Sequence, residues 1–261
     1  VPCYLSTISV HYKNLRFLSW QLSHYIHSNG KGEIYDTVIA EQAKDIIIDF
    51  LERGENNVVF VNEINNAKNN FKSFERLFDK EKYIIYKPSN FDVFNNSNHP
   101  YGCTVAITKK NSFWESSRSI DLIEGKNGEL SYANKSVVLK NGDIILAGVH
   151  IPYDIAYWNE IINYFKENLE KRLYIVGDFN VSDEDTSRKQ KFAELKKEGA
   201  IDVWLNMGGD NGHITHTRGG RLDYLLSSVI GYSSIRKMSY LDSFRVNGCT
   251  DHSGVFFEIK R

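Results

Sequence analysis

Short apolar runs, rich in β-branched and aromatic residues, recur along the whole chain, and segments of helical periodicity separate some of them. Such runs predict strands that are buried in a sheet. Strands that alternate with helices predict an α/β (α+β) fold. The predicted strands are Leu15–Trp20, Val58–Val61, Tyr83–Tyr86, Cys103–Thr108, Val137–Lys140, Ile144–Val149, Leu173–Val176, Tyr224–Leu226 and Val255–Ile259.

The helical segments place apolar residues on one stripe and charged residues opposite it. The segment 182–199 also opens with Ser and Asp residues that suit a helix N-cap, and it ends at Gly199, which suits a helix C-terminus. We therefore predict helices in residues 34–53, 68–78, 156–172 and 182–199.

The composition supports one large domain. With 261 residues, 41% of them hydrophobic, the chain can bury a sizeable core, and no Pro/Gly/Ser-rich linker divides it. We predict a single domain over residues 1–261. Lysine and arginine number 32 against 33 acidic residues, so the net charge of −1 gives no overall basic surface for nucleic acid. A local basic groove remains compatible with this balance.

The cysteines are few and far apart, at Cys3, Cys103 and Cys249. They form neither a disulfide framework nor a zinc pair, so an intracellular, reducing setting is favoured over a secreted one. No apolar run approaches the roughly 20 residues of a membrane helix. The first ten residues lack the features of a signal peptide, and the initial Val1 suggests a processed or trimmed N-terminus. Nothing in the sequence indicates an obligate protein partner.

Titratable or metal-binding side chains directly follow or precede several predicted strands. Each alone has a simpler interpretation: a solvated acid, a structural histidine, or an Asx turn for the pair at positions 178 and 180. Those two side chains, however, point to one face of an extended backbone, and strand ends are where sites assemble in α/β sheets. Their coincidence predicts one shared site. The residues are Glu63, His150, Asp178, Asn180, Asp223, Asp251 and His252.

The motifs "LRFLSWQ", "VVFVNE", "YGCTVAITKK", "IILAGVHIPY", "YIVGDFNV", "THTRGGRLDYLLSS" and "TDHSGVFFEI" resemble those of the endonuclease/exonuclease/phosphatase superfamily. This DNase I-like superfamily includes DNase I, apurinic-site endonucleases, neutral sphingomyelinases and inositol-phosphate 5-phosphatases. The motifs occur in the family's order over nearly the whole chain. The resemblance implies a four-layer α/β/β/α sandwich of two packed mixed sheets, with a site at one edge.

The resemblance also implies a bound Mg²⁺, with Mn²⁺ as a possible substitute. Glu63 matches the acid that holds this ion, and carboxylate oxygens suit a hard cation. Asp251, directly before the family's histidine, is a further candidate metal ligand. Asp178 matches the carboxylate that orients or activates the nucleophile. Asn180 matches the amide that contacts the scissile phosphate or the metal.

Three further positions match residues that move protons or stabilise charge. His252 matches either the general base beside the attacking water or the group that stabilises phosphate charge, and Asp223 matches its partner carboxylate. His150 matches the second histidine of the DNase I-like and sphingomyelinase branches, a candidate general acid. Such chemistry suits an anionic phosphodiester, which needs a cation, a base for water and an acid for the departing alkoxide.

Two departures from the family's pattern concern the metal and the branch. The first strand ends in "LSWQ" where the family has Trp-Asn, so we expect Gln21 to serve the metal in place of that Asn. The alternative is weakened metal binding. His150 stands where apurinic-site endonucleases carry a tyrosine, which favours the DNase I-like, sphingomyelinase or deadenylase-like branches. Tyr153 lies close enough in sequence to reach a phosphate.

Basic residues suggest where a substrate binds. Four residues directly precede Asp223, in a segment that borders the cleft of the family: His213, His216, Arg218 and Arg221. Of these, Arg218 or Arg221 is a candidate phosphate ligand. Lys109, Lys110 and Arg118 around Trp114, and the segment 188–197, could instead follow a phosphate backbone or simply be solvated. A zinc site with His213 and His216 is the less favoured interpretation, because no cysteine pair is near.

The resulting expectation is a metal-dependent enzyme that hydrolyses phosphodiester bonds in DNA or RNA. The alternatives are a phosphatase or sphingomyelinase-type phospholipase on the same scaffold, acting on a phosphorylated small molecule or lipid, or a binding protein with weakened catalysis. The motifs describe the phosphate and not what is attached to it, so they do not separate these alternatives.

Overall fold

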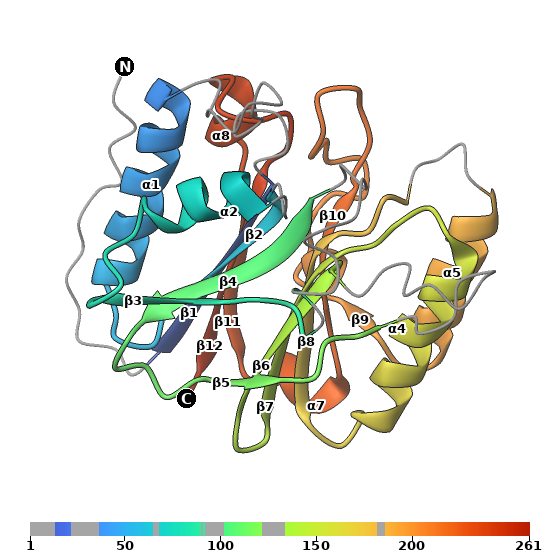
Figure 1. Cartoon of the computed structure of the whole chain (residues 1–261). Coiled ribbons are helices and arrows are strands. Elements are labelled where there is room, and N and C mark those ends of the chain that lie inside the picture. The colour runs from blue at the N-terminus through green and yellow to red at the C-terminus, as the bar shows by residue number, and fades with distance from the viewer. Residues whose placement is uncertain are drawn as a thin grey trace.

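Two six-stranded β-sheets pack face to face, and helices cover both outer faces, so that the molecule has four layers (Figure 1). The computed structural model describes residues 14–21, 37–64, 68–89, 91, 102–121, 134–181 and 186–261. The four-layer α/β/β/α sandwich expected from the sequence is confirmed.

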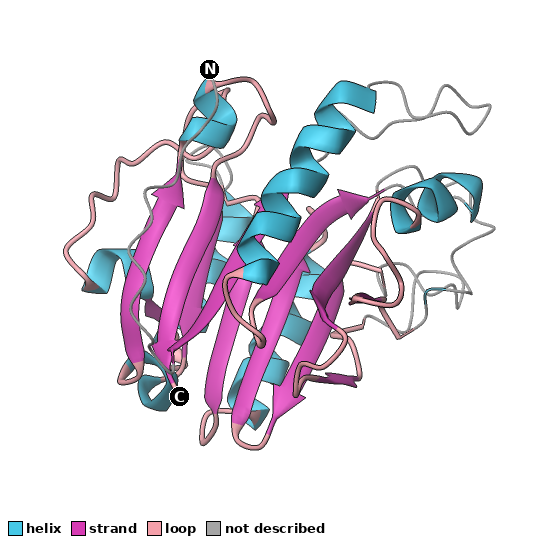
Figure 2. Cartoon of the chain, turned by 90° about the vertical axis from the view of Figure 1, so that its left-hand side faces the viewer, coloured by secondary structure: helices cyan, strands magenta, loops and turns pink. Residues whose placement is uncertain are grey.

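The first sheet has the strand order β11-β12-β1-β2-β4-β3. β1 is parallel to β2, and the other neighbours are antiparallel. Figure 2 looks onto the side of this sheet that α1 covers. The bounds are β1 Asn14–Gln21, β2 Val58–Ile64, β3 Tyr83–Tyr86, β4 Cys103–Lys109, β11 Ile235–Leu241 and β12 Gly254–Lys260.

The second sheet has the order β5-β6-β7-β8-β10-β9, in which only the β7–β8 pair is parallel. Both sheets are therefore mixed, and each has a parallel pair near its centre. The bounds are β5 Glu115–Ser117, β6 Ser136–Asn141, β7 Ile144–His150, β8 Arg172–Asp178, β9 Ile201–Asp202 and β10 Asp223–Ser227.

Helices α1 (Thr37–Glu52) and α2 (Lys68–Glu75) pack on the first sheet, and α4 (Ile155–Glu167) and α5 (Thr186–Lys197) pack on the second. Asp154 caps α4 by accepting a hydrogen bond from the backbone N–H of Ala156. Three single-turn helices complete the described elements: α6 Val203–Asn206, α7 Val229–Tyr232 and α8 Ser243–Val246.

The core has three parts because each sheet is apolar on both faces. Large rings such as Phe17, Phe60, Tyr174 and Phe257 fill the space between the sheets, and all four are fully buried. Two further clusters lie between each sheet and its helices. This packing holds the two sheets in one fixed relation, so that strand ends from both can form a single site.

Most predicted elements are present, and the differences have local causes. β11 was not predicted because Arg236 and Lys237 interrupt its apolar pattern, and the strand lies at a sheet edge where charge is tolerated. The short β5 and β9 and the single-turn helices are too brief for a periodic signal. The predicted start of α1 at residue 34 and the predicted cap residues 182–185 lie outside the described residues.

Two observations bear on the cysteine and membrane predictions. Cys103 is a buried free thiol, while Cys3 lies outside the described residues. Within the described ranges, no helix combines the length and the apolar character that a membrane crossing requires.

Candidate active site at one edge of the two sheets

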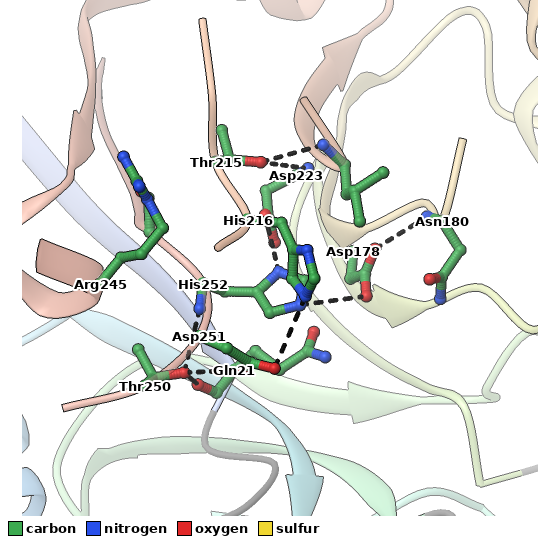
Figure 3. A network of polar contacts seen from close by, with 12 residues as sticks. Gln21, Asp178, Asn180, Thr215, His216, Asp223, Arg245, Thr250, Asp251 and His252 are labelled. Carbon is green, nitrogen blue, oxygen red and sulfur yellow. Dashed lines mark hydrogen bonds and ion pairs between the residues drawn. The ribbon is translucent and has the colours of Figure 1, made fainter. Parts of the chain in front are cut away.

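Strand register brings the predicted polar residues of the second sheet to one edge. Asp178, the last residue of β8, lies opposite His150 at the end of β7 and opposite Asp223 at the start of β10. In the first sheet, Gln21 ends β1, and His252 directly precedes β12. Side chains from both sheets therefore meet at the same edge (Figure 3).

The carboxylate of Asp178 makes a turn and also faces the site. Its Oδ1 accepts a hydrogen bond of 2.8 Å from the backbone N–H of Asn180, which is an Asx turn. Its Oδ2 lies 3.8 Å from Nε2 of His150 and 4.0 Å from Nε2 of His252.

The preceding Gly177 has φ 145°, and a Cβ there would lie 1.9 Å from the carbonyl oxygen of Val149. Only glycine allows β7 and β8 to approach this closely.

His252 and Asp223 form a buried pair. Nδ1 of His252 lies 2.9 Å from Oδ2 of Asp223, and both residues are less than 5% exposed. Burial disfavours the charged imidazole, but Asp223 and, to a smaller extent, Asp178 outweigh this and raise the pKa of His252 to about 10. The ring is therefore an imidazolium at neutral pH, with Nε2 directed toward Asp178.

Burial disfavours the charged form of Asp178 as well. It raises the pKa of this carboxyl to about 7, although His252 opposes the rise. A carboxyl with a pKa near neutrality can exchange a proton with bound water at physiological pH. The site thus pairs an imidazolium that is charged at neutral pH with a carboxyl whose pKa is raised to about 7.

Glu63 lies on a distorted part of β2. The register between β2 and β4 shifts after Val61, and Glu63 has φ 58°, in the left-handed region. In the described part of the chain, the other non-glycine residue in this region is Asn180, with φ 52°. Such backbone costs of order 1–3 kcal/mol and collects at functional sites. Both residues belong to the candidate site.

His150 holds Glu63 in place. Its Nε2 lies 3.3 Å from Oε1 of Glu63. Burial, together with the positive charges of Lys135 and His252, lowers the pKa of His150 well below its ordinary value. A neutral imidazole that donates from Nε2 accounts for this contact. Its Nδ1 is buried and has no hydrogen-bond partner among the described residues.

Gln21 and Glu63 supply oxygen atoms that fit a magnesium ion. Nε2 of Gln21 donates to Oε1 of Glu63 at 3.0 Å. Oε1 of Gln21 is buried and, within the described ranges, accepts no hydrogen bond. An unsatisfied buried acceptor costs about 1–3 kcal/mol, which a cation would recover. An amide and a carboxylate oxygen are ligands that Mg²⁺ accepts, and water or phosphate oxygens commonly complete its shell.

Comparisons with known proteins show the fold. No protein-family model matches the chain, and no curated protein matches its sequence. Solved structures do match. An AP endonuclease from Leishmania major superposes with a TM-score of 0.70 at 12% identity, over 95% of this chain and 88% of that one. An AP endonuclease from Archaeoglobus fulgidus gives 0.64 at 12% identity, over 93% and 98%.

A third match is a 3′ phosphatase from Neisseria, solved with a product DNA hairpin. It has a TM-score of 0.64 and 12% identity, over 94% of this chain and 99% of that chain. The chain has the DNase I-like fold. The three matches cover almost all of their own lengths as well, so the likeness extends to the complete sandwich and not to one of its sheets.

On the DNase I-like fold of this chain, His216 joins the predicted residues. It forms an isolated β-bridge with His252, and the two rings meet edge to face with centroids 4.6 Å apart. Its Nε2 lies 3.6 Å from Oδ2 of Asp251. Asp251 therefore lies beside His216. Ligating atoms of His216, Asp251 and His252 all lie within 4.8 Å of one another.

Asn180 and Tyr153 lie at the rim. Nδ2 of Asn180 donates to the carbonyl of Ile151, and the guanidinium of Arg188 donates to the backbone carbonyl of Asn180. The same guanidinium lies over the ring of Tyr153, 4.3 Å from its centroid. Because Tyr153 is 71% exposed, this arginine–tyrosine pair presents an accessible surface beside Asn180.

Arg221 is not placed to meet a phosphate. It forms a two-bond ion pair with Asp202, at 2.6 and 3.1 Å, and both side chains are only 4% exposed. The guanidinium also lies over Tyr224. This geometry indicates a structural role and opposes the expectation of a substrate contact. Arg218 is exposed, and its backbone N–H donates to Nδ1 of His216.

Other residues considered in the sequence as substrate or zinc contacts have different surroundings. Lys109 is at the opposite end of β4 from Cys103, which pairs next to Glu63 on β2, and it forms an ion pair with Glu52. Trp114 is buried in the core, where no base can stack on it. His213 binds Asp242 at 3.1 Å and stacks on Tyr240, so it does not form a zinc site with His216.

Three residues of this region were missed or undervalued. Lys135 is 5% exposed and donates to the carbonyl of Gly102. Burial lowers its pKa to about 8, although Glu63 and Asp178 oppose the shift. No local sequence signal marks a buried lysine. His216 and Arg188 had a signal, since His216 stands in the motif "THTRGGRLDYLLSS" and Arg188 follows the motif "YIVGDFNV", but spacing alone could not select them from neighbouring polar residues.

Proposed function

We propose that this protein is a metal-dependent phosphodiesterase that hydrolyses nucleic acid, with Mg²⁺ held at Glu63 and Gln21. The observation that carries the proposal is the buried group of Asp178, Asp223 and His252 beside these two residues. Burial of two carboxylates and an imidazole is costly. A site that performs chemistry on charged substrates explains why the fold retains them.

The structural neighbours support a nucleic-acid substrate. Two of them are AP endonucleases, and the third is a 3′ phosphatase solved with a DNA product. At 12% identity these likenesses support the scaffold, while the chemistry is argued from the residues of this chain.

The chain's own residues divide the work of hydrolysis. A bound Mg²⁺ would neutralise charge that develops on the phosphoryl oxygens. Asp178 is proposed as the general base, because its pKa of about 7 suits removal of a proton from water. Its Oδ2 makes no hydrogen bond to a described residue, so it can accept one from the nucleophile.

His252 is proposed to bind the scissile phosphate as an imidazolium. Of the two roles expected for it, charge stabilisation agrees with a pKa raised to about 10, and the general-base role does not. Asp223 fixes its orientation through Nδ1 and leaves Nε2 for the substrate. Asn180, on its strained backbone, would position the same phosphate.

We propose a different role for His150 from the expected general acid. A histidine whose pKa lies well below its ordinary value is not an imidazolium near neutral pH, so it lacks the acidic proton that a general acid gives, and water would protonate the departing alkoxide. As a neutral donor it orients Glu63, in the way that ligands of metal ions are commonly oriented by a second group.

A substrate panel tests the proposal. Single-stranded and double-stranded DNA, RNA, inositol phosphates and sphingomyelin are each incubated with Mg²⁺, with Mn²⁺ and with chelator. We expect Mg²⁺-dependent cleavage of a nucleic acid, which Asp178→Ala and His252→Ala abolish without loss of folding. Asp143→Asn, an exposed carboxylate at the other end of the sheet, is the matched control and should retain activity.

Other outcomes would replace the proposal. Turnover of inositol phosphates or sphingomyelin without cleavage of nucleic acid would favour a phosphatase or phospholipase. Tight binding of nucleic acid with no turnover and no metal uptake by calorimetry would favour a binding protein in which Gln21 no longer supports the metal. Full activity in Asp178→Ala would remove the assigned mechanism.

A further inference from the structure

His216 lies against the candidate catalytic histidine, although the sequence indicated only that it directly precedes Asp223 near the cleft and could join a disfavoured zinc site. It is bridged to His252 through the backbone, and their rings are in edge-to-face contact (Figure 3). Its side chain keeps 12% of its surface exposed, so it borders both the buried group and solvent. A third imidazole at this position needs a chemical explanation.

The backbone of Arg218 determines which tautomer His216 adopts. The N–H of Arg218 donates to Nδ1 of His216 at 3.1 Å. A nitrogen that accepts a hydrogen bond carries no proton, so the proton of the neutral ring is on Nε2. The nearest carboxylate oxygen, Oδ2 of Asp251, is 3.6 Å from Nε2, which is too long for a good hydrogen bond. The N–H of His216 is therefore a donor held close to His252 and open to an incoming acceptor.

We infer that His216 contacts the substrate and donates its Nε2–H to a phosphoryl oxygen of the scissile group. The inference rests on the proposed phosphodiesterase function and adds a donor to it. The ring gives a hydrogen bond and keeps its proton, so no further base or acid is required. Together with the imidazolium of His252, it would surround the oxygens on which charge develops, where preformed donors act most strongly.

The chain around His216 is anchored on both sides, as a precise donor requires. Oγ1 of Thr215 accepts hydrogen bonds from the backbone N–H groups of Leu222 and Asp223. The carbonyl of Thr215 accepts from the N–H of Ser253, and the N–H of Thr217 donates to the carbonyl of Asp251. These bonds join the His216 loop to the segments that carry Asp223 and His252.

A metal ion bound by His216, Asp251 and His252 is the competing explanation for the same cluster. Coordination through Nε2 of His216 requires a lone pair on that nitrogen, which moves the proton to Nδ1. That proton would then face the N–H of Arg218. The hydrogen bond to Nδ1 therefore favours a donor over a ligand.

Substitution of His216 tests the inference. His216→Leu replaces the imidazole donor with an apolar side chain. We expect kcat to fall about 10²-fold, the size of effect typical for loss of one such donor, and KM to change by a few fold at most. His216→Gln retains an N–H donor and should recover at least part of this loss. His213→Gln is the matched control, because His213 is bonded to Asp242, and it should leave kcat unchanged. Thermal unfolding of all three variants reports any loss of folding.

A spectroscopic measurement tests the tautomer without activity. Nitrogen-15 NMR of histidine-labelled protein should show His216 as a neutral ring protonated on Nε2. A ring protonated on Nδ1, or the loss of one bound Mn²⁺ or Zn²⁺ per chain in His216→Leu, would overturn the inference in favour of a metal ligand. Parental kcat in His216→Leu would also overturn it. Absence of cleavage by the parent protein would instead refute the proposed function, and this inference with it.

Discussion

The two ends of β8 place charged residues in opposite environments. At the first residue, Arg172 pairs with Asp143 through two bonds of 2.9 and 3.0 Å, and the Asp143 side chain is 54% exposed. At the last residue, Asp178 is 1% exposed and lies among His150 and His252. One end of β8 therefore contributes Arg172 to a solvent-exposed ion pair, and the other end carries the buried carboxyl of Asp178.

The difference shows where the fold tolerates the free-energy cost of burying a charged group. An exposed pair loses little solvation and gains little, about 0–1 kcal/mol. A buried group loses several kcal/mol of solvation for each ion, which its own attractions only partly offset. The raised pKa of Asp178 expresses this cost, because burial is its largest cause. We therefore expect substitutions at the two ends to separate activity from stability.

The largest effect is expected for Asp178→Asn. Loss of the proposed base should reduce kcat by about 10²–10⁴-fold. The unfolding temperature should stay equal or rise, because an amide of the same shape removes a buried charge. Steady-state kinetics and thermal unfolding measure the two effects. Asp143→Asn is the comparison at the exposed end, and a comparable loss of kcat in that variant would contradict the distinction.

The next largest effect is expected for Arg221→Met. Arg221 forms a buried ion pair with Asp202, to which we assign a structural role alone. The variant leaves Asp202 buried without its counter-charge, which should cost about 3–5 kcal/mol of unfolding free energy. Urea denaturation measures this value. A cost below about 1 kcal/mol, with a large rise in KM, would show that Arg221 serves the substrate after all.

A pH dependence distinguishes the histidine at the buried end. The pKa of His252 is raised to about 10 in the folded protein, above the ordinary value near 6.5 in the unfolded chain. The resulting stabilisation is complete below about pH 6.5 and is lost as the pH rises through about 10. The unfolding free energy should therefore decrease as the pH is raised across this range. In Asp223→Asn, which removes the partner carboxylate, the decrease should be smaller, and an unchanged profile would be inconsistent with the pairing.

The smallest effect is expected at the exposed end. A double-mutant cycle with Arg172→Ala and Asp143→Ala should give a coupling of about 0.2–1 kcal/mol at low ionic strength. The coupling should decline in high salt, because solvent-exposed charges are screened. Denaturation at two salt concentrations measures it, and a coupling that persists undiminished in high salt would mean that this pair resembles the buried end.

The fold could be predicted because its signals are local and periodic. Short runs such as Ile144–Val149 and Leu173–Val176 are apolar on both faces, as buried strands must be. An acid or histidine at successive strand ends also indicated where a site would lie. The charged strand β11 could not be predicted, since its apolar pattern is interrupted by Arg236 and Lys237.

The sequence predicted which residues form the site better than it predicted their burial and protonation. Asp178, Asp223 and His252 were selected from strand ends, and the structure brings them together. Arg221 and Trp114 were misleading, because residue type does not reveal whether a side chain will be buried. The burial of Lys135, the tautomer of His216 and the neutral state of His150 depend on neighbours that are distant in sequence.

The pairing of β12 with β1 has a consequence for a partly made chain. β12 is the last strand in the chain, yet it lies between β1 and β11 in its sheet, and the loop before it carries His252. During synthesis, the earlier strands can form before this strand is available. If the site acts as proposed, a growing or truncated polypeptide would carry Asp178 and Glu63 but no His252, and would leave nearby nucleic acid intact.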